Sequence, residues 1–338
     1  MRFLFLYFFT LSVLNNVLSQ TNYNSCGNFP DWENIIQVST PVPDSLPKFL
    51  VITNRPFSPD NEDKIYLPNG IAQYRKVTYL EVACNGTKWL IHPREDFNDA
   101  MKIMDEGKDI LLFVHGHGKS FPLSLPRALQ VKNRYDVSLI LFDWPAKHSN
   151  FNKSLARVRR CGENFYNLLL DLQEYHANSM SDNQHLSILA HSLGNYYLTH
   201  FVVNGSWQYL NAAFVDNIIF NAPAVRSKEH GEIISRITIS NNKYVVLNKN
   251  DRVLKSAYLL TSGKMLGNIV IKPYAENTIY VNFTEIAGKE HTYFVGYHPF
   301  ENENKTVFEL YNTLIHGGKP DFNTSDFEVL NEKEYFIK

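Results

Sequence analysis

In the segment Leu186-Ser-Ile-Leu-Ala-His-Ser-Leu-Gly-Asn195, an apolar run meets a turn of small residues and then a helical pattern. The run Leu186–Ala190 predicts a buried strand, and the pattern after Gly194 predicts a helix that follows with almost no loop. A serine on such a strand–turn–helix, with small residues two positions before and after it, is typical of a nucleophile held in a strained turn. The helix directs its first N–H groups and its positive dipole end toward the serine oxygen. The segment therefore predicts that Ser192 is a nucleophile, with Ala190 at a position where glycine is more usual.

Short apolar runs recur along the chain and alternate with segments of helical length, such as Phe151–His176. These runs are too apolar for strands that expose one face to solvent. They are Ile110–Val114, Val137–Phe142, Leu186–Ala190, Val215–Phe220 and Tyr244–Leu247. The alternation predicts an α/β fold whose mostly parallel central sheet is flanked by helices on both faces. Two earlier runs, Phe49–Thr53 and Tyr74–Val82, predict an antiparallel edge.

One α/β domain from residue 46 to residue 317 accounts for these elements. Before it, residues 20–45 are rich in Asn, Pro and Ser and predict a surface lead segment, and residues 318–338 predict a polar C-terminal tail. Hydrophobic residues make up 44% of the chain, which is enough for a large buried core. The 33 Lys and Arg residues nearly balance the 34 Asp and Glu residues, so no charge excess favours binding to nucleic acid.

The N-terminal residues 1–19 combine an early positive charge, Arg2, with an apolar run and the small-residue pattern Val17-Leu-Ser19. This pattern predicts a cleaved signal peptide and an exported protein. A membrane anchor is the competing interpretation, but Asn15 and Asn16 interrupt the run before the roughly 20 apolar residues that a spanning helix needs. No later segment is long and apolar enough to span, so we expect no stable membrane span.

The chain has three cysteines: Cys26, Cys84 and Cys161. Export allows disulfides that the cytosol would reduce. We expect a Cys26–Cys84 bridge, which would tie the lead segment to the domain, because Cys161 lies on a predicted helix.

An acid and a base are needed to activate the serine, since a serine hydroxyl is a weak nucleophile until a histidine takes its proton. Asp251 is the best-placed carboxylate, because it follows the apolar strand Tyr244–Leu247 after a short polar turn. Asp216 begins a strand instead of ending one. Glu229 and Glu232 lie in a polar stretch and are interpreted as solvated charges.

Three histidines downstream of Asp251 are candidates for the base. His291 lies in the loop that should follow a last strand at Ile279–Phe283, near the carboxyl ends of the strands. His298 precedes Pro299 in an aromatic stretch and fits equally well as a packed loop residue, and His316 lies near the end of the chain. We favour His291. His191, beside the serine, is interpreted as a packing residue under the turn.

An oxyanion hole requires a second backbone N–H from the loop after an earlier strand, and Leu112-Phe-Val-His-Gly-His-Gly118 supplies such a loop. We assign the N–H groups of His117 and Leu193 to the hole. His115 and His117 also raise the possibility of a metal site, but no carboxylate or cysteine cluster completes one. We therefore expect no metal, and the mechanism requires no cofactor.

Six segments between about residues 48 and 295 together resemble the α/β-hydrolase superfamily, and within it a sparsely characterised branch of esterases and hydrolases of unknown function. The segments are Val51-Ile-Thr-Asn-Arg55, Phe113-Val-His-Gly-His117, Phe142-Asp-Trp-Pro-Ala146, Ala190-His-Ser-Leu-Gly194, Asn250-Asp-Arg-Val-Leu254 and His291-Thr-Tyr-Phe294. The resemblance implies a catalytic triad of Ser192, Asp251 and His291. Asp143-Trp-Pro145 is interpreted as part of a loop beside the site, with Trp144 packed in the core.

These residues predict acyl transfer to water through an acyl-enzyme. The short segment between Asn221 and Lys243 leaves little room for a lid, so we expect a small-molecule ester or an ester exposed on a carbohydrate or lipid headgroup. A serine peptidase or amidase would use the same triad and is the first alternative. A non-catalytic binding protein of the same fold is the second.

Overall fold

The computed structural model describes residues 32–60, 64–66, 71, 76–105, 107–147, 151–205, 210, 213–261, 263–295 and 304–338. The predicted signal peptide, Cys26 and His298 lie outside these residues. Cys84 is disulfide-bonded, and Cys161 is free and buried. Within the described part of the chain, no helix has both the length and the apolar character needed to cross a membrane.

A sheet of twelve strands forms the centre of the described chain, in the order β1-β6-β5-β2-β8-β7-β9-β10-β11-β12-β14-β13. Its parallel core consists of β2 (Lys48–Thr53), β8 (Ser138–Asp143), β7 (Ile110–Val114), β9 (Leu186–His191), β10 (Asn217–Asn221), β11 (Asn242–Leu247) and β12 (Thr278–Asn282). The predicted apolar runs form these strands, and the expected α/β fold with a mostly parallel sheet is confirmed.

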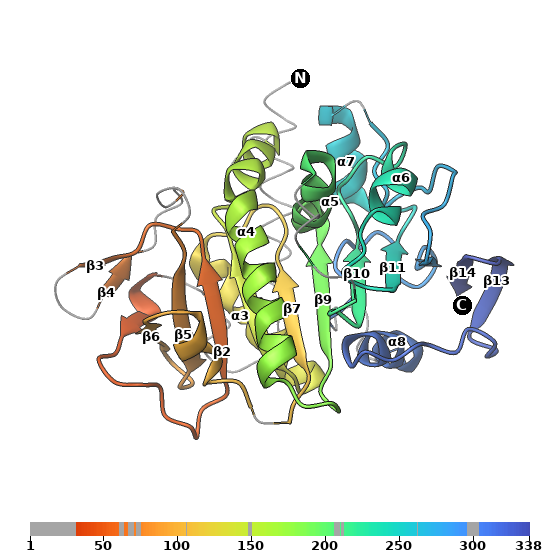
Figure 1. The fold of residues 1–338 in the computed structure, drawn as a ribbon. Coiled ribbons are helices and arrows are strands. Elements are labelled where there is room, and N and C mark those ends of the chain that lie inside the picture. Colours follow the sequence, from red (N-terminus) through yellow and green to blue (C-terminus); the bar gives the residue numbers. More distant parts are fainter. Residues whose placement is uncertain are drawn as a thin grey trace.

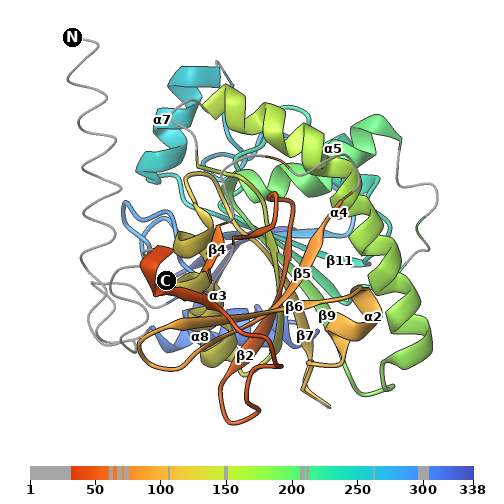
Figure 2. The same ribbon diagram turned by 90° about the vertical axis from the view of Figure 1, so that its left-hand side faces the viewer.

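Helices cover both faces of this sheet, which explains why its strands are apolar on both sides. The long helix α4 (Phe151–Ser179) and α5 (Asn195–Asn204) lie on one face, whereas α3 (Phe121–Tyr135) and α8 (Lys305–Ile315) lie on the other (Figures 1 and 2). Between α4 and the sheet, the ring of Phe142 packs against Phe165 and Tyr197 with centroid distances of 5.0 and 5.1 Å. The other α-helices of the described residues are α2 (Phe97–Met101), α6 (His230–Ser235) and α7 (Arg252–Thr261).

The predicted antiparallel edge is present on one side of the sheet. Strand β2 pairs with β5 (Thr78–Cys84), and β5 pairs with β6 (Trp89–Arg94). The lead segment contributes a 3-10 turn at Trp32–Asn34 and the strand β1 (Ile35–Gln37), which pairs with β6. The prediction of a lead lying only on the surface, residues 20–45, is therefore wrong for its last part, because Ile35 and Val42 are buried. A separate ribbon is formed by β3 (Ser58–Asp60) and β4 (Lys64–Tyr66).

The opposite side of the sheet corrects the prediction of a C-terminal tail over residues 318–338. Strand β14 (Glu334–Ile337) pairs in parallel with β12, and β13 (Phe327–Asn331) pairs with β14 in an antiparallel hairpin. The aromatic residues scattered in this segment hold it in place, since Phe322 stacks on Tyr335 at a centroid distance of 4.2 Å. The domain therefore continues to the last strand.

Candidate active site

Ser192 lies in a sharp turn between β9 and α5, as the sequence predicts. Its backbone φ of 54° is in the left-handed region, which a residue with a side chain rarely adopts without a tight structural constraint. The turn is held close to β7: a Cβ atom on Gly194 would lie 2.7 Å from the carbonyl oxygens of Val114 and His115. A Cβ on Gly116 would lie 2.8 Å from the Cβ of Ser192. Glycine at these two positions is what allows the turn and the loop after β7 to touch.

Asp251 and His291 meet beyond the carboxyl ends of β11 and β12. The Nδ1 atom of His291 lies 2.5 Å from Oδ2 of Asp251, whose side chain is fully buried. Oδ1 of Asp251 accepts from the N–H of Leu254 in the first turn of α7, and the Tyr293 hydroxyl donates to Oδ2 at 3.3 Å. The carboxylate is thus fixed on both oxygens, and it fixes the imidazole in turn.

Asn248 joins the loop that carries Asp251 to the loop that carries His291. Its side-chain amide donates to the carbonyl oxygens of Gly288 at 3.1 Å and Glu290 at 2.9 Å. Sequence reasoning missed Asn248 and the Tyr293 hydroxyl, although both stand within three residues of a predicted catalytic residue. Asn248 directly follows the predicted strand Tyr244–Leu247, and Tyr293 lies in the segment His291-Thr-Tyr-Phe294. The signal that could have found them was therefore their position close to the candidate acid and base.

His191 packs between the turn and the candidate base. Its ring centroid is 4.7 Å from that of His291, and its Nδ1 lies 2.9 Å from the side-chain amide of Asn221, which can donate to it. Burial lowers the pKa of His191 well below its ordinary value, and electrostatic interactions with His291, Arg127 and Lys119 lower it further. A neutral His191 therefore lies against His291 without adding a charge. Within the described residues, no hydrogen bond joins Ser192 Oγ to His291, a contact that often tightens only when substrate binds.

The other predicted candidates for acid and base lie elsewhere. His316 pairs with Asp109, and Asp216 pairs with His185, both at the amino ends of strands. Glu232 is in α6, and Glu229 makes only a loose contact with Arg226 at 3.9 Å.

The loop after β7 carries His115, Gly116 and His117 next to the Ser192 turn. His115 is buried, with its ring stacked on Trp144 at 5.5 Å and 5°, and its Nε2 lies 3.2 Å from Oδ1 of Asp143. The described residues contain no group of three His, Cys, Asp or Glu side chains that could hold a metal ion. His115 contacts the core of the protein, whereas the proposed role of His117 and Leu193 concerns only their backbone N–H groups.

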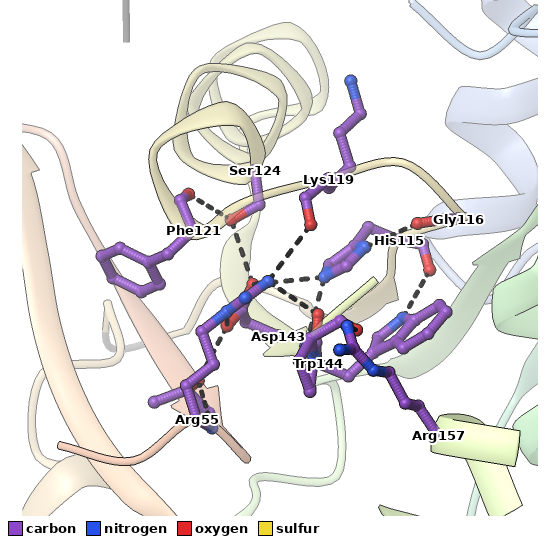
Figure 3. A network of polar contacts seen from close by, with 11 residues as sticks. Arg55, His115, Gly116, Lys119, Phe121, Ser124, Asp143, Trp144 and Arg157 are labelled. Atoms are coloured by element: carbon purple, nitrogen blue, oxygen red, sulfur yellow. Dashed lines mark hydrogen bonds and ion pairs between the residues drawn. The ribbon is translucent and has the colours of Figure 1, made fainter. Parts of the chain in front are cut away.

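A buried ion pair, unforeseen from the sequence, lies beneath this loop (Figure 3). Arg55 follows β2 and Asp143 ends β8, and Arg55 Nε lies 2.6 Å from Asp143 Oδ2, with both side chains fully buried. Thr53 and Ser124 also donate to this carboxylate, at 2.7 and 3.3 Å. Burial raises the pKa of Asp143, but the charge of Arg55 and the contacts with His115 outweigh burial and hold the pKa well below its usual range. Asp143 is therefore a permanent anion under the loop.

Comparison with known proteins agrees with this fold. The model of a family described as alpha/beta hydrolase of unknown function (DUF900) matches residues 92–312, which include Ser192, Asp251 and His291. The chain belongs to this family. Comparison with curated proteins gave no match.

Among solved structures, the chain is similar to an esterase from Pyrobaculum calidifontis, at 12% identity and a TM-score of 0.40 over 71% of this chain and 81% of the other. It is also similar to a fungal esterase from Rhizomucor miehei, at 11% identity and a TM-score of 0.40 over 80% of this chain and 86% of the other. A third is esterase B from Lactobacillus rhamnosis, at 10% identity and a TM-score of 0.37 over 71% and 81% of the two chains.

Proposed function

We propose that this α/β hydrolase is an exported serine hydrolase that cleaves carboxylic esters through a triad of Ser192, His291 and Asp251. The observation that supports this most strongly is the 2.5 Å contact between Asp251 and His291, at the same edge of the sheet as Ser192. The left-handed backbone of Ser192 is a second support, because it is the conformation of a nucleophile held at a strand–helix turn.

In the proposed reaction, His291 Nε2 removes the proton from Ser192 Oγ as that oxygen attacks the carbonyl carbon. The carbonyl oxygen becomes an oxyanion and accepts hydrogen bonds from the backbone N–H groups of His117 and Leu193. The bond to the alcohol then breaks, and His291 returns the proton to the leaving oxygen. Water repeats the sequence on the acyl-enzyme and releases the acid. Asp251 keeps the His291 ring oriented and stabilises its transient positive charge.

A modest acyl group, or an ester exposed on a carbohydrate or a lipid headgroup, is the proposed substrate. Between β10 and β11 the described chain forms only the six-residue helix α6, so this connection supplies no large lid for a long acyl chain. Export rests on the signal-peptide pattern of residues 1–19, and the disulfide at Cys84 fits an oxidising compartment.

A fluorophosphonate probe followed by mass spectrometry of the labelled peptide tests the proposal. We expect covalent labelling at Ser192 in the wild-type protein and none in Ser192→Ala or His291→Gln. A folded wild-type protein that stays unlabelled would contradict the proposal and favour a non-catalytic binding protein. Turnover of p-nitrophenyl esters of increasing chain length should then be highest for short chains, whereas peptide cleavage without ester cleavage would favour the peptidase alternative.

A further inference from the structure

The loop that carries the proposed oxyanion donor His117 is anchored on both sides by side chains from outside it. On one side, the indole Nε1 of Trp144 donates to the carbonyl oxygen of His115 at 2.9 Å. On the other side, Nη2 of Arg55 donates to the carbonyl oxygen of Lys119 at 3.2 Å (Figure 3). Within the described part of the chain, neither donor side chain forms a hydrogen bond with a candidate triad residue.

Further contacts connect these two anchors into one unit. The same Nη2 of Arg55 donates to the carbonyl oxygen of Trp144 at 2.7 Å, and Arg55 Nε binds Asp143 at 2.6 Å. The N–H of Gly118 donates to the carbonyl oxygen of Ala146 at 3.1 Å, so the loop after β8 also holds the loop after β7. His115 Nδ1 donates to the carbonyl oxygen of Gly116 at 2.9 Å, which orients the peptide unit between Gly116 and His117.

That peptide unit is the one whose N–H belongs to His117. Its carbonyl oxygen is held by His115, and Trp144 holds the preceding unit through the His115 carbonyl. The following unit is held through the Gly118 N–H by Ala146, and Arg55 holds the chain two units further on, at the Lys119 carbonyl. Because the energy of an oxyanion hole depends on donors that are already in place before the charge develops, fixing this unit has a direct effect on catalysis.

We propose that Arg55, Asp143 and Trp144 are positioning residues that hold the His117 N–H in place for the oxyanion. This inference rests on the proposed function. Arg55 places its planar fork on a carboxylate and on two backbone carbonyls, a task that lysine cannot perform with one point charge. Asp143 holds Arg55 in the orientation that makes the fork available.

A second buried ion pair shows that burial alone does not explain the arrangement. Glu81 on β5, with a fully buried side chain, pairs with Arg94 at 2.7 Å and with Lys48 at 3.1 Å. Within the described residues, the Arg94 guanidinium contacts the carboxylates of Glu81 and Asp99 and bonds to no loop backbone. A buried ion pair is weak evidence of stabilisation in general, since well-packed apolar residues often do as well. The Arg55–Asp143 pair differs because Arg55 also donates to the backbone carbonyls of Lys119 and Trp144, in the loops beside the candidate site.

The experiment measures kcat per active site, with active sites counted by fluorophosphonate titration, in full-length Arg55→Lys and Trp144→Phe. The affinity for an ester-like trifluoromethyl ketone, which forms an oxyanion in the hole, is measured in parallel. We expect Arg55→Lys to lower kcat about 10- to 100-fold, as a small misplacement of a catalytic group does. Trp144→Phe removes only the indole N–H and should lower kcat about fivefold. Inhibitor affinity should fall by the same factors while KM stays within about twofold, because the interaction is made in the transition state.

The matched control is Arg94→Lys at the Glu81 pair, which should lower the Tm but leave kcat per titrated site unchanged. If Arg55→Lys and Trp144→Phe also keep wild-type kcat and inhibitor affinity, the positioning role is wrong while the proposed function stands. If the wild-type protein is not labelled at Ser192, both fail. Should Arg55→Lys not fold, Trp144→Phe decides the question alone, since it keeps the ring stacked on His115.

Discussion

Two Asp–His pairs in this molecule have the same contact distance. One lies at the carboxyl ends of the parallel strands and the other at their amino ends. His291 Nδ1 lies 2.5 Å from Asp251, and His316 Nδ1 lies 2.5 Å from Asp109. The Nε2 of His316 is occupied, since it lies 3.0 Å from the carbonyl oxygen of Tyr135. Among the described residues, Nε2 of His291 has no hydrogen-bond partner. An Asp–His contact alone therefore does not identify a base, and the two pairs differ in whether the second ring nitrogen is already occupied.

The largest expected effect comes from exchanging the acid in each pair. Asp251→Asn should lower kcat about 10³- to 10⁴-fold, because the amide cannot hold the histidine tautomer or its positive charge. Asp109→Asn should leave kcat per titrated site unchanged and lower only the Tm, since it loosens α8 from the amino end of β7. Ester kinetics and thermal unfolding of the two variants decide between the pairs. Equal losses of kcat in Asp251→Asn and Asp109→Asn would show that the Asp251 pair has no special role in catalysis.

A smaller loss of kcat is expected from changing Asn248, which joins the loop of Asp251 to the loop of His291. Asn248→Ala removes the donors to Gly288 and Glu290, so His291 loses its fixed distance to Asp251, and kcat should fall about 10-fold or more. The pair at the amino end serves as the control, because His316→Gln should not change kcat. Steady-state kinetics with a short p-nitrophenyl ester measures both. An Asn248→Ala variant with wild-type kcat would show that the loops hold their places without it.

The third prediction concerns how the free energy of unfolding depends on pH through His191, whose ring packs against His291. Burial and electrostatic interactions with neighbouring groups lower the pKa of His191 well below its ordinary value, so below about pH 6.5 the unfolded chain binds a proton that the folded chain does not. The free energy of unfolding should therefore fall as the pH is lowered from about 6.5, by up to about 1.4 kcal/mol per pH unit from this group. Urea unfolding at about pH 7 and about pH 5 measures the fall.

His191→Gln should flatten this part of the profile. The anion Asp143, whose pKa is lowered, contributes stability that is lost only below about pH 4, so its contribution should persist in the variant. An unchanged profile in His191→Gln would show that other groups cause the fall.

The smallest expected effect comes from the second donor to Asp251. Tyr293→Phe removes a hydroxyl that donates to Oδ2 at 3.3 Å and should lower kcat about fivefold, which corresponds to about 1 kcal/mol. In the described part of the chain, the Asp109 carboxylate accepts from the His185 N–H and contacts His316, but it has no tyrosine donor, so this variant tests a contact that only the Asp251 pair has. Comparison of kcat in Tyr293→Phe and wild type is sufficient. A loss as large as that in Asp251→Asn would mean that the ring, and not the hydroxyl, was disturbed.

The sequence predicted the central strands well because each is a buried apolar run between polar turns. It also predicted which of three histidines lies against Asp251, since position after a strand places a residue at the carboxyl edge of a parallel sheet. Strand β6 was missed because Trp89-Leu-Ile-His-Pro-Arg94 mixes apolar and polar residues without clear alternation.

Contacts between distant segments account for the remaining misses. Arg55 and Asp143 are 88 residues apart, and only the neighbouring positions of β2 and β8 in the sheet bring them together. Arg55 follows an apolar strand and Asp143 ends one, so the sequence places both residues at the carboxyl edge of the sheet. Nothing in either segment indicates that the two side chains form an ion pair. The contact between His316 and Asp109 was missed for the same reason, because the two residues are 207 positions apart. The position of His316 near the end of the chain was enough to rank it below His291 as a base.

The C-terminal hairpin determines how the sheet ends. Strand β12 is parallel to its neighbour β11 and would present a row of unpaired backbone groups on its other side if β14 did not cover it. Exposed edges of this kind recruit strands from other molecules and lead to aggregation. Lys338 bonds through its N–H to the carbonyl oxygen of Asp326, so even the last residue is held in the hairpin. Removing residues 327–338 for expression would therefore move the open edge of the sheet from β13 to the largely buried strand β12, and we expect the shortened protein to aggregate.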